Sequence, residues 1–350
     1  MNTRKSNIEL LRIVAMIMII GHHLAIHSHF PEDMILINNL WIKFIQMGGK
    51  IGVNIFILIS GYFLVTNPTI RVEKILKLWL EVIVYSVVFL FCNYFYVGKI
   101  SPSDILIHVL PISFSEWWFI STYFVLYLCS PLLNIMLKSL VKETYLKMLL
   151  LFGVLWIIFP SVLKQSMQSN SLIWFIYVYS TGGYIRLHGK EINYLKNNFL
   201  GYSMVGMLLA FMAVVSLDIL ENRGYSIGFG INDIYAAQSL PIVLTSLFLF
   251  LGFLKLSIPY SRTINSIAST TFGIYLLHDN SFSQNFLWNG LFNCSRGAYS
   301  VWFIPYTLLM IFLVFCLCCL IDLTRIHFVE NKLSTMIDKL ANRISKRINS

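Results

Sequence analysis

Charged side chains are scarce in this chain of 350 residues, making up 12% of it against 57% apolar residues. With a mean hydropathy of +0.72, the composition lies outside the range of soluble globular domains, in which about 25% of residues are charged. Long polar stretches are missing as well, so no segment between the apolar runs can form a separate soluble domain. The sequence therefore excludes a soluble enzyme and predicts one domain embedded in a membrane.

Cysteine patterns and internal repeats are also lacking. The six cysteines show neither a disulfide framework nor the spacing of a zinc site, and Cys294 alone lies outside the apolar runs. We find no internal repeat, which argues against an inverted-repeat transporter. The first apolar stretch is not a cleavable signal peptide, because Arg12 interrupts it and no small-residue cleavage site follows.

Apolar runs with the length of a membrane-crossing helix, about 20 residues, recur along the whole chain. We therefore predict an all-α fold, a polytopic bundle of about ten transmembrane helices. The predicted spans are residues 8–27, 46–66, 76–97, 117–137, 145–163, 171–187, 199–219, 233–254, 266–287 and 301–323.

The distribution of positive charge supports this count. With a cytoplasmic N-terminus, 19 of the 26 lysines and arginines fall on the cytoplasmic side, six fall outside and Arg12 lies within the membrane. Cytoplasmic loops are expected to hold this excess, so both termini are predicted to be cytoplasmic. We assign residues 1–325 to the transmembrane domain and residues 326–350 to a basic cytoplasmic tail that lies on anionic lipid. The net charge of +10 is explained without nucleic-acid binding.

The first span carries ionisable residues where a plain membrane anchor has none. Arg12 and His23 are eleven positions apart, which is about three turns plus 20° on a helix, so they share a face about 16 Å apart along the axis. Glu9 and His27 flank them on the same stripe. Charged residues within a membrane cost at least about 2.5–3.5 kcal/mol and mark pathways or reaction centres. Alternatively, Arg12 and Glu9 pair with each other and extend to the lipid headgroups.

His23 is the candidate general base, because imidazole can exchange a proton near neutral pH. The adjacent His22 points about 100° away and is interpreted as a packing residue. His278 lies in the outer half of the span 266–287, at the predicted depth of His23, so the two histidines either flank one cavity or His278 only bonds a backbone carbonyl. His23 and His27 have metal-binding spacing, but no third ligand is evident, so no metal site is predicted.

Polar residues on other spans are candidates for substrate contacts. Asn54, Ser60 and Tyr62 are the polar members of the second span, although packing alone explains each of them. Arg71 begins a basic segment at the cytoplasmic surface that either reflects the positive-inside rule or docks a phosphorylated donor. This segment also contains Lys74 and Lys77.

The fourth span opens with aromatic residues on the predicted external side. Trp118 and Tyr123, together with Glu116, would line an external mouth in which aromatic faces suit sugar rings. Interfacial anchoring is the alternative for the tryptophans. Tyr275 precedes His278 by three positions and is placed in the same predicted cavity, and Asp279 would orient His278 or cap the helix end.

Four segments of the chain match a known family in order. They read ELLRIVAMIMIIGHH, GGKIGVNIFILISGYFL, WWFISTYFVLYLCSPLLN and STTFGIYLLHDN. With these segments and its predicted helix count, the chain resembles the membrane acyltransferase-3 family, the bacterial O-acyltransferases that modify surface polysaccharides and other envelope glycans. The resemblance extends from about residue 4 to the end of the last predicted span.

The resemblance implies roles for the first span. The family signature of an arginine and a histidine eleven positions apart falls on Arg12 and His23, with its acidic residue on Glu9. It implies that His23 is the catalytic base, that Arg12 contacts the acyl donor, and that acyl-CoA enters from the cytoplasm.

The chain departs from the family pattern in two places. Relatives usually carry closely spaced arginines before the third span, whereas this chain has only Arg71 there, so donor contacts would pass to Lys74 or Lys77. It also has no appended extracytoplasmic esterase-like domain. Transfer would then finish within the membrane domain or with a separate partner protein.

The resulting prediction is an integral-membrane O-acyltransferase of the bacterial cytoplasmic membrane, without a bound cofactor and with acetyl-CoA as co-substrate. Its acceptor would be an envelope polysaccharide or a lipid-linked precursor, and a homodimer is an open alternative. His23 would either deprotonate the acceptor hydroxyl or itself take up the acyl group. The rival functions are a polysaccharide exporter or flippase and a structural membrane subunit. Polar residues concentrated on four spans favour a compact site over an export path.

Overall fold

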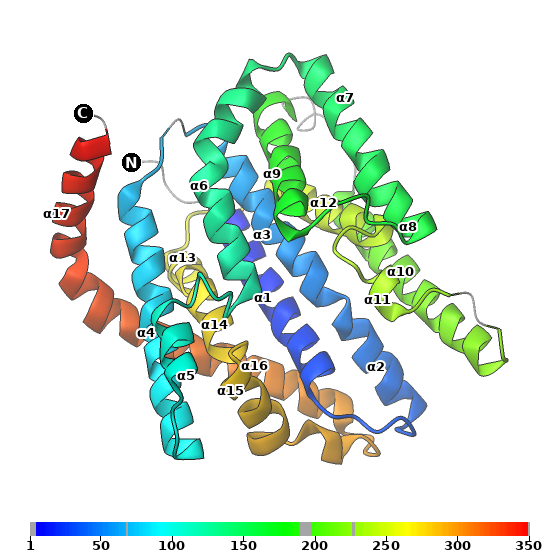
Figure 1. The fold of residues 1–350 in the computed structure, drawn as a ribbon. Helices are drawn as coiled ribbons and strands as arrows, with labels where there is room; N and C mark the ends of the chain where they lie inside the picture. The colour runs from blue at the N-terminus through cyan, green and yellow to red at the C-terminus, as the bar shows by residue number, and fades with distance from the viewer. Residues whose placement is uncertain (1–4, 68, 190–197, 226–227, 349–350) are drawn as a thin grey trace.

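The computed structural model describes residues 5–67, 69–189, 198–225 and 228–348. In these ranges every regular element is a helix, so the predicted all-α fold is confirmed (Figure 1). The first half contains α1 (Ser6–His27), α2 (Leu36–Gln46), α3 (Gly48–Leu64), α4 (Val72–Val97), α5 (Pro102–Val109), α6 (Trp118–Ser139), α7 (Lys142–Gly153), α8 (Phe159–Leu163) and α9 (Ser171–His188). The second half contains α10 (Phe199–Asn222), α11 (Ile231–Ile234), α12 (Leu240–Lys255), α13 (Arg262–Ser269), α14 (Thr271–His278), α15 (Ser281–Asn285), α16 (Phe303–Arg325) and α17 (Asn331–Ile348).

Seven helical stretches of the described residues are long and apolar enough to cross a membrane. They are Ser6–His27, Leu36–Leu64, Val72–Tyr96, Trp118–Ser139, Lys142–Leu163, Phe199–Asn222 and Phe303–Ile344. Three predicted spans are not among them: 171–187 corresponds to α9, and 233–254 to the 16-residue α12. The third, 266–287, is divided among α13, α14, α15 and a π-helical turn. The count of ten and the cytoplasmic termini stay predictions.

The division of that third span has a local cause. Thr270 and Thr271 bond back to backbone carbonyls three residues earlier, and the Asn280 side chain accepts the backbone N–H of Phe282 at the start of α15. Short polar side chains of this kind compete with the helical backbone pattern. The chain therefore turns directly after His278, and the last residue of α14 and the residues of the turn reach the interior of the bundle.

Helix α1 lies at the centre of the bundle and contacts α2, α3, α12, α13, α14 and α16 (Figure 1). Ile8, Leu11 and Ala15 on this helix are fully buried. The helix is therefore held from several sides along its length, which fixes the orientation of the side chains near its end. Helix α17 lies outside this group and packs against α4. The described part of the segment assigned to the basic tail, residues 326–348, is helical, with a π-helical stretch at Ile326–Glu330 followed by α17.

Helices α3 and α9 approach closely through two glycines. A β-carbon at Gly182 would lie 2.3 Å from the Leu58 carbonyl oxygen, and one at Gly61 would lie 2.0 Å from the Tyr179 carbonyl oxygen. Small residues allow such backbone contact between helices in membranes. Tyr179 then donates a 2.7 Å hydrogen bond to Asn134 on α6, which joins a third helix to the pair.

Gly182→Ala is expected to lower the melting temperature of the purified protein, because the added methyl group must push against a backbone carbonyl. Overpacking of this kind costs about 1–3 kcal/mol. Gly290→Ala is the control, because the nearest atom to a β-carbon there is 3.8 Å away. Equal melting temperatures for the two variants would contradict the close packing of α3 on α9.

Candidate functional site

The structure brings the two predicted histidines together. His23, near the end of α1, and His278, the last residue of α14, are both buried. The Nδ1 atom of His23 lies 2.9 Å from the Nε2 atom of His278. His278 Nδ1 lies 2.6 Å from the carbonyl oxygen of Ile274. His278 is thus the carbonyl-bonded histidine of the second reading; it lies against His23 and is not among the described residues that line the cavity there.

These contacts fix the proton positions of the neutral rings. A carbonyl oxygen only accepts hydrogen bonds, so His278 Nδ1 donates to Ile274 and carries a proton. In the neutral ring the Nε2 atom of His278 is then an acceptor, and His23 Nδ1 must donate to it. A neutral His23 consequently has its unprotonated nitrogen at Nε2. This nitrogen is the one on the side of Asp279.

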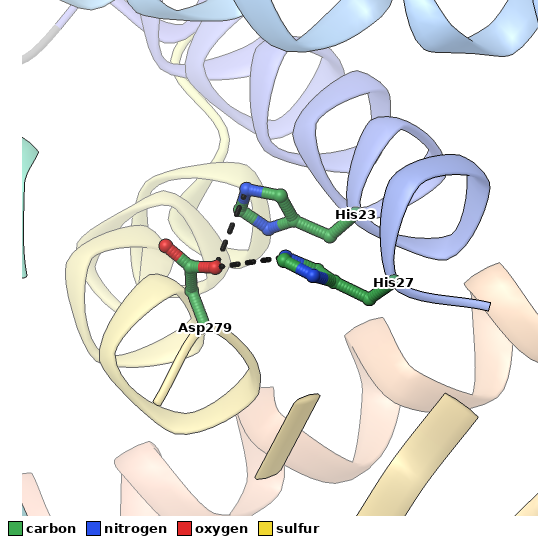
Figure 2. A group of neighbouring side chains, drawn as sticks. All are labelled: His23, His27 and Asp279. Atoms are coloured by element: carbon green, nitrogen blue, oxygen red, sulfur yellow. Dashed lines mark ion pairs between the residues drawn. The ribbon is translucent and has the colours of Figure 1, made fainter. Parts of the chain in front are cut away.

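Asp279 places a carboxylate beside two histidines of α1. Its Oδ1 atom lies 3.4 Å from His23 Nε2 and 3.6 Å from His27 Nε2, and Figure 2 shows the carboxylate facing both rings. Gln284 donates a 2.9 Å hydrogen bond to the same oxygen. The sequence predicts only an orienting or capping role for Asp279. Its position directly after His278 was the feature of the sequence that could have placed the Asp279 carboxylate in the site itself.

A cavity of about 210 Å³ adjoins this cluster. His23, His27 and Asp279 form part of its lining, and Trp118 and Tyr275 contribute aromatic walls. Both aromatic residues were predicted to lie at this site. Such a volume accommodates a small substrate group between polar atoms and aromatic faces.

Lys50 is the one lysine or arginine among the described residues that line this cavity. Its Nζ atom lies 5.1 Å from the centroid of the Trp118 ring, within the range of a cation–π contact. A second, more open cavity of about 610 Å³ also includes Lys50, Trp118 and His22 in its lining. Sequence reasoning missed Lys50, which was counted only among the external lysines.

Two other predicted cavity residues, Tyr123 and Asn54, are not among the described residues that line this cavity. Tyr123 stacks on Phe119 with ring centroids 6.0 Å apart, and its hydroxyl accepts a 3.3 Å hydrogen bond from Ser60. Asn54 accepts from the Trp174 indole and donates to the Ala237 carbonyl. Both polar atoms of the Asn54 side chain thus form hydrogen bonds within the protein, which agrees with the alternative that packing alone explains this residue.

Glu116 supports the turn that carries Asp279. It is not among the described residues that line the cavity near His23. Instead, its side chain accepts a 2.8 Å hydrogen bond from Asn280 and a 2.5 Å bond from Ser86, and it lies 3.1 Å from His108 Nδ1. Because Asn280 also caps α15, Glu116 anchors the residues that follow His278 to α4 and α5.

Arg12 and Glu9 lie in the N-terminal half of α1, away from the described lining of the cavity. Arg12 Nε lies 3.7 Å from Glu9 Oε2, which makes a partly exposed ion pair. Near this end of the bundle, Arg186 donates a 3.3 Å hydrogen bond to the Tyr62 hydroxyl, and Lys5 lies 5.9 Å from the Tyr62 ring centroid. Sequence reasoning assigned neither Lys5 nor Arg186 to the site.

The basic residues before and within α4 differ in their surroundings. Arg71 is exposed at the N-cap of α4, and Lys74 is exposed one turn later. Lys77 instead pairs with Glu73 at 2.9 Å and lies 3.8 Å from Glu330. The charge of Lys77 is therefore balanced within the protein, and the structure favours Arg71 over Lys77 for contact with an external anion.

Comparison with known proteins gives one match. A family model described as an acyltransferase domain, the acyltransferase-3 model, matches residues 5–323, which is nearly the whole chain. No curated protein and no solved structure matches.

Proposed function

The chain belongs to the acyltransferase-3 family and is a membrane acyltransferase; from this premise we propose that it moves an acetyl group from acetyl-CoA to a hydroxyl of an envelope glycan. The observation that carries the proposal is the hydrogen bond between His23 and His278. It holds Nδ1 of His23 and leaves Nε2 as the basic atom beside a cavity.

The proposed reaction needs one proton acceptor and one site for the reacting groups. His23 Nε2 takes the proton of the acceptor hydroxyl as the hydroxyl oxygen attacks the thioester carbon. The carbon–sulfur bond then breaks, and the leaving thiolate takes the proton from His23. In a second route, Nε2 attacks the thioester carbon and the carbon–sulfur bond breaks to release the thiolate. The hydroxyl oxygen then attacks the acyl carbon, the carbon–Nε2 bond breaks, and the hydroxyl proton passes to the thiolate. Both routes require the same unprotonated nitrogen.

Asp279 suits the charge that forms during this step. Its Oδ1 atom is 3.4 Å from His23 Nε2, longer than the about 3 Å of an ordinary hydrogen bond. The carboxylate is nevertheless close enough to stabilise the positive charge of the imidazolium. Trp118 and Tyr275 supply aromatic faces for a sugar ring in the cavity.

The donor is proposed to reach the cavity along α1 from the predicted cytoplasmic side. Its phosphates would contact Arg71, Lys74 and Arg186, with Arg12 further along the arm of the coenzyme. Ser60 and Tyr62 lie on α3 between this basic region and the cavity. The protein would act in the bacterial cytoplasmic membrane, alone, as a homodimer or with a separate extracytoplasmic partner.

An export function fits these observations less well. A polysaccharide exporter needs a polar path wide enough for a sugar chain, whereas the cavity at His23 measures about 210 Å³ and is lined by Phe119, Tyr275 and Trp118. This volume suits the transfer of a small group at His23 Nε2, one of the basic nitrogens in the lining.

Removal of the gene is expected to lower the O-acetyl content of envelope glycans, and the parent gene should restore it. His23→Ala should reduce restoration on the order of 10²–10⁴-fold, the contribution of a general base, with normal accumulation in the membrane. His22→Ala removes the neighbouring imidazole, which contacts the Gln46 carbonyl, and should cause a much smaller loss. If acyl transfer survives in His23→Ala but is lost in His22→Ala, His23 is not the base.

Arg12→Ala is expected to weaken acetyl-CoA binding to the purified protein at least several-fold, and Arg12→Lys should restore only part of it. The reason is that an ammonium group cannot replace the two-pronged contact of a guanidinium with an anion. Arg223→Ala, which removes an exposed arginine at the end of α10, is the control. Unchanged affinity for acetyl-CoA in both Arg12 variants would show that Arg12 does not bind the donor and only pairs with Glu9.

A further inference from the structure

Three potential metal-ligand atoms meet beside the cavity. His23 Nε2, His27 Nε2 and Asp279 Oδ1 all lie within 4.8 Å of one another (Figure 2). His23 and His27 are one turn apart on α1, and Asp279 approaches them from the end of α14. We propose that these three residues form a reversible zinc-binding site that inhibits acyl transfer when it is occupied. The inhibitory part rests on the proposed function, whereas the binding part does not.

The separations suit a tetrahedral ion. With ligand bonds of about 2.0–2.2 Å, two ligands of a tetrahedral Zn²⁺ lie roughly 3.3–3.5 Å apart. The Oδ1 atom of Asp279 is 3.4 Å from His23 Nε2 and 3.6 Å from His27 Nε2. The ligand atoms of the two histidines lie within 4.8 Å of each other, so three-point coordination requires the two rings to move closer together around the carboxylate. The sequence predicted no metal site because a third ligand was not evident, and Asp279 is a suitable one.

The groups behind the ligands have the arrangement found around metal-binding histidines. Such a histidine usually donates its second ring N–H to an acceptor, which fixes the ring and its tautomer. His23 does so through Nδ1 to His278, which is held in turn by the Ile274 carbonyl. Gln284 donates to Asp279 and fixes the carboxylate. The ligand atoms of His23 and Asp279 are therefore oriented before any ion enters.

The composition of the site favours zinc and moderate affinity. Two imidazoles and one carboxylate are typical ligands for Zn²⁺, whereas Mg²⁺ prefers oxygen ligands. The cavity leaves a fourth position for water. Lys50 also lines this cavity, and its positive charge opposes a cation, so binding should be reversible and should not resemble a permanent structural site.

Zinc and the acceptor hydroxyl would compete for one lone pair. The unprotonated Nε2 atom of a neutral His23 can either coordinate the ion or accept a proton, but it cannot do both at once. A bound ion would also hold Asp279 and fill part of the cavity. Zinc occupancy therefore switches off the base that the proposed reaction uses.

The binding test uses the full chain purified without a polyhistidine tag and stripped with a chelator. Calorimetry with Zn²⁺ should give one site per chain, and Mg²⁺ should give none. His27→Asn and Asp279→Asn should each weaken Zn²⁺ binding at least tenfold. His29→Asn is the matched control, because this exposed histidine lies two positions beyond His27 and outside the cluster, and its affinity should equal that of the parent.

A gain-of-ligand variant guards against misfolding as an explanation. His27→Cys keeps a metal ligand at this position, so its Co²⁺ complex should show a thiolate-to-cobalt charge-transfer band that the parent complex lacks. Absence of a stoichiometric Zn²⁺ site, or affinity that is unchanged in both His27→Asn and Asp279→Asn, would overturn the zinc site and leave the acyltransferase proposal intact.

The inhibition test measures acyl transfer in membranes as a fraction of each variant's own metal-free activity. Zn²⁺ should inhibit the parent, a chelator should reverse the inhibition, and the inhibitory concentration should rise at least tenfold in His27→Asn but not in His29→Asn. Stoichiometric Zn²⁺ binding at the three residues without loss of transfer would overturn the inhibitory role and contradict His23 as the base.

Discussion

The hydrogen bond between His23 and His278 depends on two helices that meet deep inside an apolar bundle. Neither ring can turn freely, because His278 is also bonded to the Ile274 carbonyl and α1 is packed by helices on several sides. A buried polar group without a partner costs about 1–3 kcal/mol, so each ring stabilises the other. This mutual dependence sets which nitrogen of His23 faces the cavity, and the proposed chemistry follows from that choice.

The rest of the site is arranged around this pair. The chain interrupts a predicted span after His278, and the residues of the resulting turn place Asp279 next to α1. Asn280 and Glu116 hold the turn from the other side. Polar contacts thus run from α5 through Glu116 to Asn280, and the backbone of the turn joins them to Asp279 beside α1.

Site residues could be predicted from the sequence where they lie together on one helix. The stripe with Arg12 and His23 follows from helical periodicity, and topology alone placed His278 at the same depth as His23. Asp279 could not be identified in this way, because it lies 256 positions from His23 and acts through the geometry of a turn. Lys50 was hidden for a similar reason: its role depends on where α3 begins relative to Trp118. Asn54 was a candidate for the cavity because it is a polar residue on an apolar span, but its side chain is hydrogen-bonded to the Trp174 indole and the Ala237 carbonyl.

The proposed chemistry requires that His23 rests as the neutral tautomer with its proton on Nδ1. Nitrogen-15 NMR of histidine-labelled protein in lipid nanodiscs, with the His23 signals identified by their loss in His23→Gln, measures this directly at neutral pH. We expect a protonated Nδ1 and an unprotonated Nε2 in both His23 and His278. A proton on Nε2 of His23, with or without one on Nδ1, would contradict it.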